Sequence, residues 1–463
     1  MAVKLAILGG DRTVPDGIHG IWPEIQDSDR EAVMGVLDRG ILTGGGSVES
    51  PGFAREYGAY VGARHCLAFN AGTAALHACV VAAGLEPGDE VIVPAYTYVA
   101  SALAVGLHGA RPVFADVEPD TFLLDASRVE ERITDRTRAI MAVHLHGLPC
   151  DMDALGAIAE RRGLKLIEDI SQAHGAHYGE RVVGTFGHCA GGSLNATKNL
   201  PGGEGGMFLT DADDAVVTAR RLRYMGEDPL ADDPELGRRY WAFGLGYNYR
   251  PQELPFAFAR SQLKRLDHYN AVAQRNAAIL GDGLREIPGI VPPEVPEGRE
   301  HVWYLYRALL DPDALGWTRP DWELRDRVMA ALAAEGVHTM LWQHHPLPAF
   351  TAFRAPQLRP SVAGAEPQEL RPWDPAEYPV ATQIGRRTFI VGNGATPLAA
   401  QSEELMHAYV EAFRKVFASI DELGAMEFEI PHDSLLAARY DETGGHEGEP
   451  PMLPVEAPAE ARA

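Results

Sequence analysis

The chain has 463 residues, and 46% of them are hydrophobic, which is enough to bury a large core and to form more than one domain. Its 65 Asp and Glu residues outnumber its 41 Lys and Arg residues, and the formal charge is -24. A surface of this sign repels nucleic-acid phosphates and anionic lipid headgroups, so we expect neither nucleic acid nor a membrane as a partner.

The four cysteines are scattered without the spacing of zinc ligands or of a redox pair, which is typical of reduced thiols in a cytoplasmic protein. They are Cys66, Cys79, Cys150 and Cys189. The first ten residues, MAVKLAILGG, are followed at once by Asp11 and Arg12 and do not form the apolar core of a signal peptide. No run approaches the roughly 20 apolar residues of a membrane-spanning helix. We therefore expect a cytoplasmic protein.

Between about residues 66 and 210, short apolar runs alternate with segments of helical periodicity. The runs that predict strands are CLAFN, EVIVP, RPVFADV, RAIMAVHLH and LKLIEDI, and the segments that predict helices are GTAALHACVVAAG and MDALGAIAERRG. Gly163 follows two arginines at the end of the second helical segment, which is a typical helix C-terminus. The alternation predicts an α/β fold around a mostly parallel sheet.

The pattern changes after GYNYRPQEL, where a long amphipathic stretch over residues 256–284 precedes a proline-rich break and the strand-like WYLYRALL. We predict a large domain over residues 1–262, which includes an N-terminal arm, and a smaller C-terminal α+β domain over residues 263–423. Residues 424–463 are rich in Glu, Pro, Gly and Ala without periodicity, so we expect an acidic, disordered tail there.

The first candidate site segment is FNAGTAALHA, in which a strand ends and a helix opens at Gly72 and Thr73. Free backbone N–H groups, a hydroxyl and the positive end of the helix dipole make this a seat for a phosphate. The segment lacks the GxxxxGK[ST] spacing of a nucleotide P-loop, and no GxGxxG follows a first strand. A phosphate ester smaller than these nucleotides suits the segment better.

Two further segments offer rings and imidazoles at strand ends. In PAYTYVAS, Tyr96 and Tyr98 can stack on a flat ligand ring, although ordinary core tyrosines would give the same pattern. In HLH, His144 and His146 lie on one strand face, but no third ligand is spaced to complete a metal site. We expect no metal and place these histidines on the core side of the site.

The segment LIEDISQAHG places Asp169 at the carboxyl end of a buried strand, where α/β folds collect their functional groups. A carboxylate there needs a cationic partner or hydrogen bonds, and a protonated pyridine nitrogen would be such a partner. Gln172 would then reach the hydroxyl of the same ring. Alternatively, Asp169 is only the N-cap of a following helix.

The segment SLNATKNLPGGEGG carries Ser193 and Lys198 directly before a glycine-rich loop and an apolar strand. A lysine beside flexible backbone that leads into an apolar strand is unusually placed for a mere surface charge. The alternative interpretation of this segment alone is a solvated loop lysine followed by a glycine turn.

Taken in chain order, seven blocks resemble the DegT/StrS-type family of sugar aminotransferases from about Trp22 to Phe417. The blocks are NAGTAAL, PAYTYVAS, ADVEPDTFLLD, VHLHGLPCDMD, LIEDISQAHGA, SLNATKNLPGGEGG and GYNYRPQEL. The resemblance implies the fold type I architecture of pyridoxal 5'-phosphate (PLP) dependent transferases, as in aspartate aminotransferase. It also implies a homodimer whose active sites are shared between the subunits.

The same resemblance implies a role for each matching residue. Lys198 would hold PLP as a Schiff base and act as general acid and base, and Asp169 would pair with the pyridine nitrogen. Gln172 would bind the ring hydroxyl, and Tyr98 would stack on the ring. Cofactor-phosphate ligands would be Gly72, Thr73, Ser193 and, from the partner subunit, Asn248.

Two departures from the family pattern bear on these roles. Leu194 and Pro201 stand where the family often has an aromatic residue and a Ser or Thr. The family often continues NYR with Met-x-Glu, whereas this chain continues with Pro251 and Gln252. Pro251 lacks a backbone donor and fixes φ, which changes the expected path of the chain after Asn248.

The resemblance implies transfer of an amino group from glutamine or glutamate to a keto-cyclitol or keto-sugar, in aminosugar or aminocyclitol antibiotic biosynthesis. The segments WPE and YPVATQIGRRTFIVGNGATPLAA look like the branch that acts on keto-cyclitols of the scyllo-inosose type. Relatives that dehydrate sugars carry histidine at the position of Lys198, so the lysine favours transamination. The alternatives are PLP-dependent elimination or cyclisation on the same fold, and a sensor that binds PLP or a sugar nucleotide without turnover.

Overall fold

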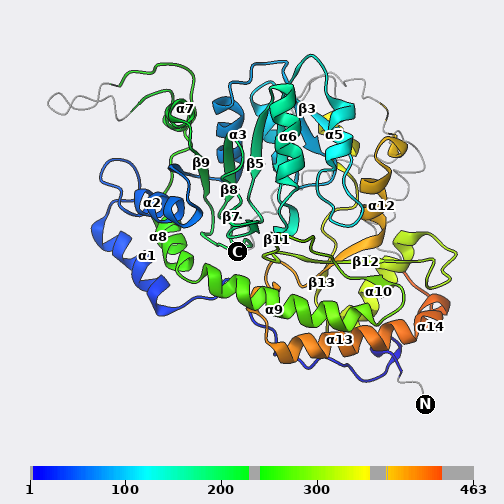
Figure 1. Ribbon diagram of the computed structural model, residues 1–463. Helices are drawn as coiled ribbons and strands as arrows, with labels where there is room; N and C mark the ends of the chain where they lie inside the picture. The colour runs from blue at the N-terminus through cyan, green and yellow to red at the C-terminus, as the bar shows by residue number, and fades with distance from the viewer. Residues whose placement is uncertain (1–3, 229–239, 355–371, 373, 430–463) are drawn as a thin grey trace, which may run out of the picture.

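The computed structural model describes residues 4–228, 240–354, 372 and 374–429. Its largest element is a seven-stranded sheet with the strand order β1-β9-β8-β5-β4-β2-β3 (Figure 1). Neighbouring strands are parallel, except that β9 runs antiparallel to both β1 and β8. The strands are β1 (His65–Phe69), β2 (Glu90–Pro94), β3 (Arg111–Ala115), β4 (Thr137–Val143), β5 (Lys165–Asp169), β8 (Cys189–Ser193) and β9 (Gly206–Thr210). The mostly parallel sheet predicted from the sequence is confirmed.

Helices cover this sheet, which explains why its central strands are continuous apolar runs rather than alternating ones. All five residues of β2 and of β9 are buried. The covering helices are α3 (Gly72–Ala82), α4 (Val99–Leu107), α5 (Ala126–Arg132), α6 (Met152–Arg162) and α7 (Asp213–Arg223) (Figure 1). The predicted end of α6 is confirmed, because Gly163 caps it in the left-handed conformation at φ 65°.

A second, antiparallel sheet follows later in the chain with the order β10-β12-β14-β13. Its strands are β10 (Ile290–Val291), β12 (Tyr306–Leu310), β13 (Thr339–Met340) and β14 (Thr388–Val391). The helices of this part are α9 (Leu266–Arg285), α10 (Asp321–Glu335), α11 (Thr351–Arg354), α12 (Pro379–Arg387), α13 (Glu403–Ala418) and α14 (Ile420–Ala425). Helices α9 and α13 lie side by side beneath the sheet (Figure 1). A short third sheet joins β6 (His177–Tyr178), β7 (Arg181–Val182) and β11 (Arg299–Glu300).

The division into domains remains a prediction, and the structure adds two observations to it. The limit at residue 262 lies at the end of α8 (Glu253–Leu263), between the two main sheets in chain order. Leu5 and Val14 of the N-terminal arm, which the sequence grouped with the large domain, pack in the core of the second sheet. Of the tail predicted over 424–463, residues 430–463 lie outside the described residues, and residues 424 and 425 belong to the end of α14.

The long amphipathic stretch expected over residues 256–284 is two helices, because the chain leaves helical geometry at Arg265. The Arg265 guanidinium donates to Asp29 Oδ2 at 2.7 Å. Helix α8 packs on α1 (Asp27–Arg39) and α2 (Glu49–Val61), whereas α9 packs on α13. These different partners require a change of direction that hydrophobic periodicity does not reveal.

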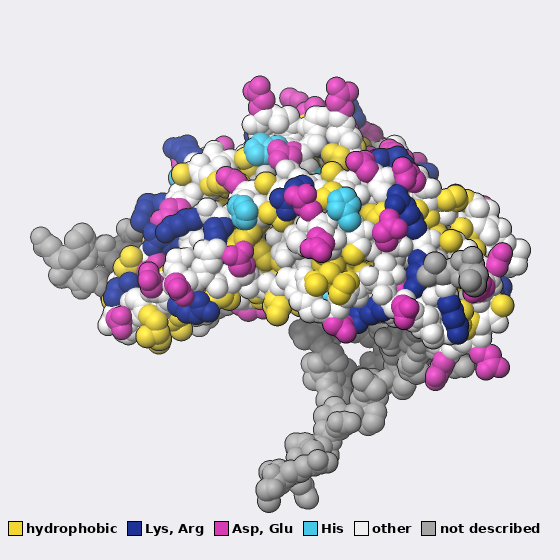
Figure 2. Space-filling view, turned by 90° about the horizontal axis from the view of Figure 1, so that it is seen from below, with side chains coloured by type: hydrophobic (Ala, Val, Ile, Leu, Met, Phe, Trp, Pro, Cys, Tyr) yellow, Lys and Arg dark blue, Asp and Glu magenta, His cyan; other side chains and the backbone are white. Residues whose placement is uncertain are grey.

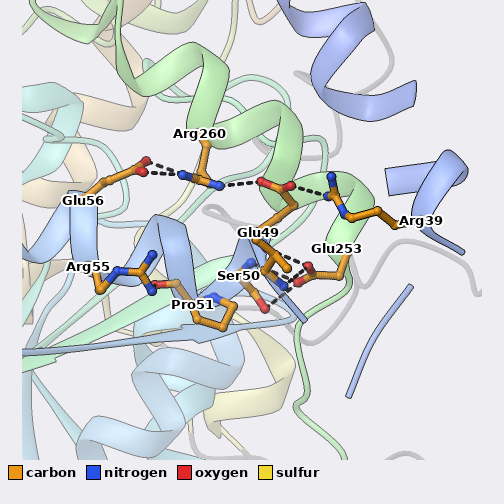
Figure 3. Close-up of polar contacts among 9 residues, drawn as sticks. Arg39, Glu49, Ser50, Pro51, Arg55, Glu56, Glu253 and Arg260 are labelled. Atoms are coloured by element: carbon orange, nitrogen blue, oxygen red, sulfur yellow. Dashed lines mark hydrogen bonds and ion pairs between the residues drawn. The ribbon is translucent and has the colours of Figure 1, made fainter. Parts of the chain in front are cut away.

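A polar network fixes α1, α2 and α8 to one another (Figure 3). The Glu253 carboxylate accepts from the backbone N–H groups of Val48 and Glu49, each at 2.6 Å, and from that of Ser50 at 2.9 Å. It also accepts from Ser50 Oγ at 2.7 Å. Arg260 pairs with Glu49 and Glu56. Because the first N–H groups of a helix lack partners within the helix, Glu253 acts as a distant N-cap of α2.

The surface seen from below mixes acidic and basic side chains with scattered hydrophobic ones (Figure 2). Among the described residues, no helix is both long enough and apolar enough to cross a membrane.

Candidate active site

A cavity of about 390 Å³ lies where the carboxyl ends of β5 and β8 meet the start of α3. The second part of the chain closes it with Tyr304, Leu305, Met340, Trp342 and Gly394. Seven of the eight predicted site residues line it, namely Gly72, Thr73, Tyr98, Asp169, Gln172, Ser193 and Lys198. Asn248 is exposed and is not among the lining residues.

The predicted phosphate seat is formed by the start of α3 and the end of β8. Helix α3 begins at Gly72 without a side-chain cap from the described residues, and Gly72 and Thr73 in its first turn line the cavity. The first N–H groups of a helix have no partner within the helix, so they are available to an anion there. A Cβ added at Gly72 would lie 2.6 Å from the Ser193 Cβ, so only glycine allows this approach. Ser193 Oγ accepts from the Asn195 N–H at 3.2 Å, which leaves its own proton to donate to an anion.

Asp169 is buried at the end of β5 and carries hydrogen bonds from neutral groups. Ser101 Oγ donates to Oδ2 at 2.7 Å, and the Ser171 N–H donates to Oδ1 at 3.0 Å. A turn follows β5 instead of a helix, so the N-cap alternative is wrong. Within the described part of the chain, no Lys or Arg forms an ion pair with Asp169, which leaves this carboxylate suited to a cationic ring nitrogen in the cavity.

Gln172 is held by the backbone of His146. The His146 N–H donates to Gln172 Oε1 at 2.7 Å, so the amide nitrogen of Gln172 is the end left to donate. His146 has a left-handed backbone at φ 59°, and its ring meets Trp342 edge-on with centroids 5.0 Å apart. Burial, with the charges of Arg307 and Lys198, lowers the pKa of His146 to about 3, so its imidazole is neutral at physiological pH.

Lys198 is half-buried in a turn that its own neighbours set. Asn195 Oδ1 accepts from the Thr197 N–H at 3.1 Å, which is an Asx-turn, and the Lys198 N–H donates to the Asn195 carbonyl at 2.9 Å. The Trp22 indole donates to the Lys198 carbonyl at 3.1 Å. The Lys198 amine lies 3.5 Å from the Tyr304 hydroxyl. The interpretation of Lys198 as a solvated loop lysine is therefore wrong.

The two predicted tyrosines have different environments. Tyr96 is a core residue that meets Trp342 edge-on, whereas Tyr98 lines the cavity and is 57% exposed. Asn248 lies beyond the cavity, where its backbone pairs with Tyr224 in an isolated bridge. Its predicted role needs a partner subunit and stays a prediction.

The histidines of HLH have separate surroundings. His144 Nδ1 accepts from the Cys150 N–H at 3.0 Å, so Nε2 carries the proton that is shared with Glu168 at 3.1 Å. Among the described residues, no group of three or more His, Cys, Asp or Glu side chains is arranged to hold a metal. Gln343, His344 and His345, near the lining residue Trp342 in the chain, are not among the cavity-lining residues.

Several lining residues were missed by the sequence reasoning. Tyr304, Met340 and Trp342 come from the second part of the chain, and the cavity joins them to β5 and β8 only in three dimensions. Ser101 was also missed. It lies three residues after Tyr98 in the first turn of α4, and this spacing places the two side chains on the same side of the helix start.

The donor set fits PLP. The start of α3 and Ser193 suit its phosphate, the buried Asp169 suits its ring nitrogen, and the Lys198 amine suits its aldehyde. The glycine at position 72 keeps open the space that a side chain would fill.

Comparison with known proteins agrees with this donor set. Residues 23–366 match the DegT/DnrJ/EryC1/StrS aminotransferase family. The chain is 36% identical over 441 residues to L-glutamine:2-deoxy-scyllo-inosose aminotransferase of Streptomyces lividus, which covers 90% of this chain and 98% of that protein. It is 37% identical over 342 residues to GDP-perosamine synthase of Caulobacter vibrioides, covering 73% and 88%.

Among solved structures, DesV of S. venezuelae superposes with a TM-score of 0.72 at 32% identity and covers 84% of this chain and 94% of its own. The 3-amino-5-hydroxybenzoic acid synthase superposes with a TM-score of 0.75 at 27% identity, covering 92% and 100%. The chain belongs to the DegT/DnrJ/EryC1/StrS family and is a PLP-dependent aminotransferase of fold type I.

Proposed function

We propose that the protein transfers an amino group from glutamine or glutamate to a keto-cyclitol. The observation that carries the choice of acceptor is the lining of the cavity. Among the described residues that line it, Lys198 is the one cationic side chain. The remaining lining groups are hydroxyls, amides, two carboxylates and aromatic or aliphatic side chains. An uncharged polyol ring needs hydrogen-bonding groups and a flat apolar surface, and both are present here.

The proposed roles of the chain's residues follow from their contacts. When bound, PLP serves as the electron sink that stabilises the negative charge formed at the substrate carbon. Lys198 would hold PLP, and its amine would take and return the proton at the substrate carbon. Asp169, with Ser101 and the Ser171 N–H holding its oxygens, balances the charge on the ring nitrogen. Gln172 directs its amide nitrogen to the ring hydroxyl, and its orientation is set by His146.

The phosphate of PLP is proposed to lie at the start of α3, against Gly72, Thr73 and Ser193, with Tyr98 on the ring face. A nucleotide-linked keto sugar is the competing acceptor, because the name of relatives such as GDP-perosamine synthase contains a nucleotide-linked sugar. Its diphosphate would need cations at the cavity mouth. Arg223 lies away from this cavity, and Arg238 and Arg239 are outside the described residues.

We also propose a homodimer in which Asn248 completes the partner's site. Supporting this is a run of exposed large apolar side chains directly before Asn248 in the chain, a feature that often marks an interaction site. Its members include Tyr240, Trp241, Phe243, Leu245 and Tyr247, and Leu245 is 98% exposed.

The acceptor assignment is tested by steady-state kinetics with purified, PLP-loaded protein. With glutamine and glutamate as donors, kcat/KM is compared for scyllo-inosose, 2-deoxy-scyllo-inosose and a dTDP-linked keto sugar. We expect a cyclitol to be preferred by at least about tenfold, since a single unmatched polar or charged group in a binding site costs about that much. A preference for the nucleotide-linked sugar would overturn the assignment.

A further inference from the structure

The Lys198 amine lies against Tyr304, a residue to which no role has been given. The Nζ atom is 3.5 Å from the phenol oxygen and 4.7 Å from the ring centroid. Tyr304 is 9% exposed, and it packs with Leu305, Ile390 and Trp342. We infer that Tyr304 is a positioning residue for the Lys198 amine, oriented by a chain of hydrogen bonds that begins at Glu204.

The direction of each hydrogen bond in this chain is fixed from the Glu204 end. A carboxylate only accepts, so the Asn195 amide nitrogen donates to Glu204 Oε1 at 2.8 Å. That orientation leaves Asn195 Oδ1 as an acceptor. It accepts from both the Thr197 N–H at 3.1 Å and Thr197 Oγ1 at 3.0 Å.

The Thr197 hydroxyl has one proton, and Asn195 takes it. In the 3.2 Å contact between Thr197 Oγ1 and the Tyr304 hydroxyl, Tyr304 is therefore the donor and Thr197 the acceptor. The Thr197 methyl group lies against Gly394, where an added Cβ would be only 2.9 Å from Cγ2. The phenol proton is committed to Thr197.

A lone pair of the phenol oxygen is then the part of Tyr304 that faces Lys198. The amine donates to it across 3.5 Å, at the long end of hydrogen-bond distances. The face of the ring adds an electrostatic attraction for the charged amine. With the Lys198 carbonyl held by Trp22 at 3.1 Å, the residue is fixed at both its backbone and its amine.

This arrangement matters for catalysis because Lys198 has to be released and then reused within each turnover. The inference rests on the proposed role of Lys198 as the anchoring amine. A released lysine side chain has several rotatable bonds, and loss of its hold would move the amine away from the reacting carbon. Tyr304 holds the amine at the cavity wall in the geometry that proton transfer requires.

The test compares Tyr304→Phe with Tyr306→Phe. Tyr306 is a matched control, since it is two residues away and its buried hydroxyl has no hydrogen-bond partner among the described residues. We expect Tyr304→Phe to bind PLP and to lower kcat at least about tenfold with KM for the donor within about twofold, because the lost contact orients a general acid and base. Tyr306→Phe should retain the wild-type kcat.

A second readout does not depend on turnover. In cofactor-free protein at neutral pH, the acetylation rate of Lys198 is measured by mass spectrometry against exposed Lys264. Loss of the contact releases the amine from Tyr304, so Lys198 should react several-fold faster in Tyr304→Phe and at an unchanged rate in Tyr306→Phe. Thr197→Val, which cannot accept the phenol proton, should move both readouts in the same direction by a smaller factor.

Equal kcat and equal Lys198 labelling in Tyr304→Phe and the wild type would overturn the inference. A failure of the underlying function has a different signature. If Lys198→Ala still catalyses the transfer, then Lys198 is not the anchoring amine, whatever Tyr304→Phe does.

Discussion

Replacement of Glu253 by glutamine should release the start of α2. The carboxylate accepts four hydrogen bonds there, three from backbone N–H groups and one from a hydroxyl, at 2.6 to 2.9 Å. The glutamine amide keeps one oxygen as an acceptor, but its NH2 group faces N–H and hydroxyl groups that are themselves donors. About two of the four hydrogen bonds are therefore lost. Hydrogen bonds to a charged group contribute about 1.5–3 kcal/mol each and are not additive, so we expect a loss of about 3 kcal/mol in the local opening free energy.

Hydrogen–deuterium exchange of the Val48, Glu49 and Ser50 amides measures this loss directly. A loss of about 3 kcal/mol corresponds to exchange about 100-fold faster. Glu31→Gln, at an exposed site on α1, is the control and should leave exchange unchanged. If the three amides in Glu253→Gln exchange within about threefold of the wild-type rate, then the carboxylate is not the cap of α2.

The same contact predicts a pH dependence. Burial raises the pKa of Glu253, but hydrogen bonds from the Glu49 and Ser50 amides outweigh it and hold the pKa below its ordinary value. Because the folded-state pKa is the lower one, the stabilisation is complete above about pH 5 and is lost as the pH falls through the folded-state value. Wild-type protection of these amides should therefore approach that of Glu253→Gln in acid.

Three further predictions concern the cavity. Gly72→Ala should weaken PLP binding at least about tenfold, because the new Cβ clashes with Ser193. The control is Gly156→Ala on α6, where an added Cβ meets nothing within 4 Å and PLP binding should not change. An absorbance titration with PLP measures both affinities. Ser101→Ala removes a 2.7 Å hydrogen bond to Asp169 and should lower kcat/KM about tenfold, with unchanged thermal unfolding as the check on folding. Mixing inactive Lys198→Ala and Asn248→Ala subunits should restore about a quarter of wild-type activity if the sites are shared. Half of the dimers are then mixed, and each mixed dimer holds one site with both residues intact. No recovery of activity would argue against shared sites.

The parts of the fold that were predictable are those decided by local patterns. The strands EVIVP and LKLIEDI read as strands because both faces of a covered parallel sheet are apolar, and Gly163 ends α6 as its position predicted. The resemblance grouped Asp169 with Ser193 as cofactor ligands. The structure supplies the physical reason, because the two residues end adjacent parallel strands at one edge of the sheet.

The parts that were not predictable depend on contacts between distant segments. Glu253 caps a helix 204 positions earlier in the chain. Tyr304 contacts Lys198 across a separation of 106 positions. The break between α8 and α9 follows from different packing partners, which periodicity does not reveal. Asn248 acts, in our proposal, on a second copy of the chain, and no property of one subunit places it.

The central claim is that the protein catalyses an amino-group transfer that depends on Lys198. The half-reaction with the amino donor alone tests this claim most directly. PLP-loaded protein is incubated with glutamine or glutamate in the absence of any acceptor, and the keto acid released is quantified by mass spectrometry. The account predicts about one keto acid per subunit with at least one donor for the wild type and none for Lys198→Ala. Keto acid from neither donor, or equal amounts from the wild type and Lys198→Ala, would contradict it.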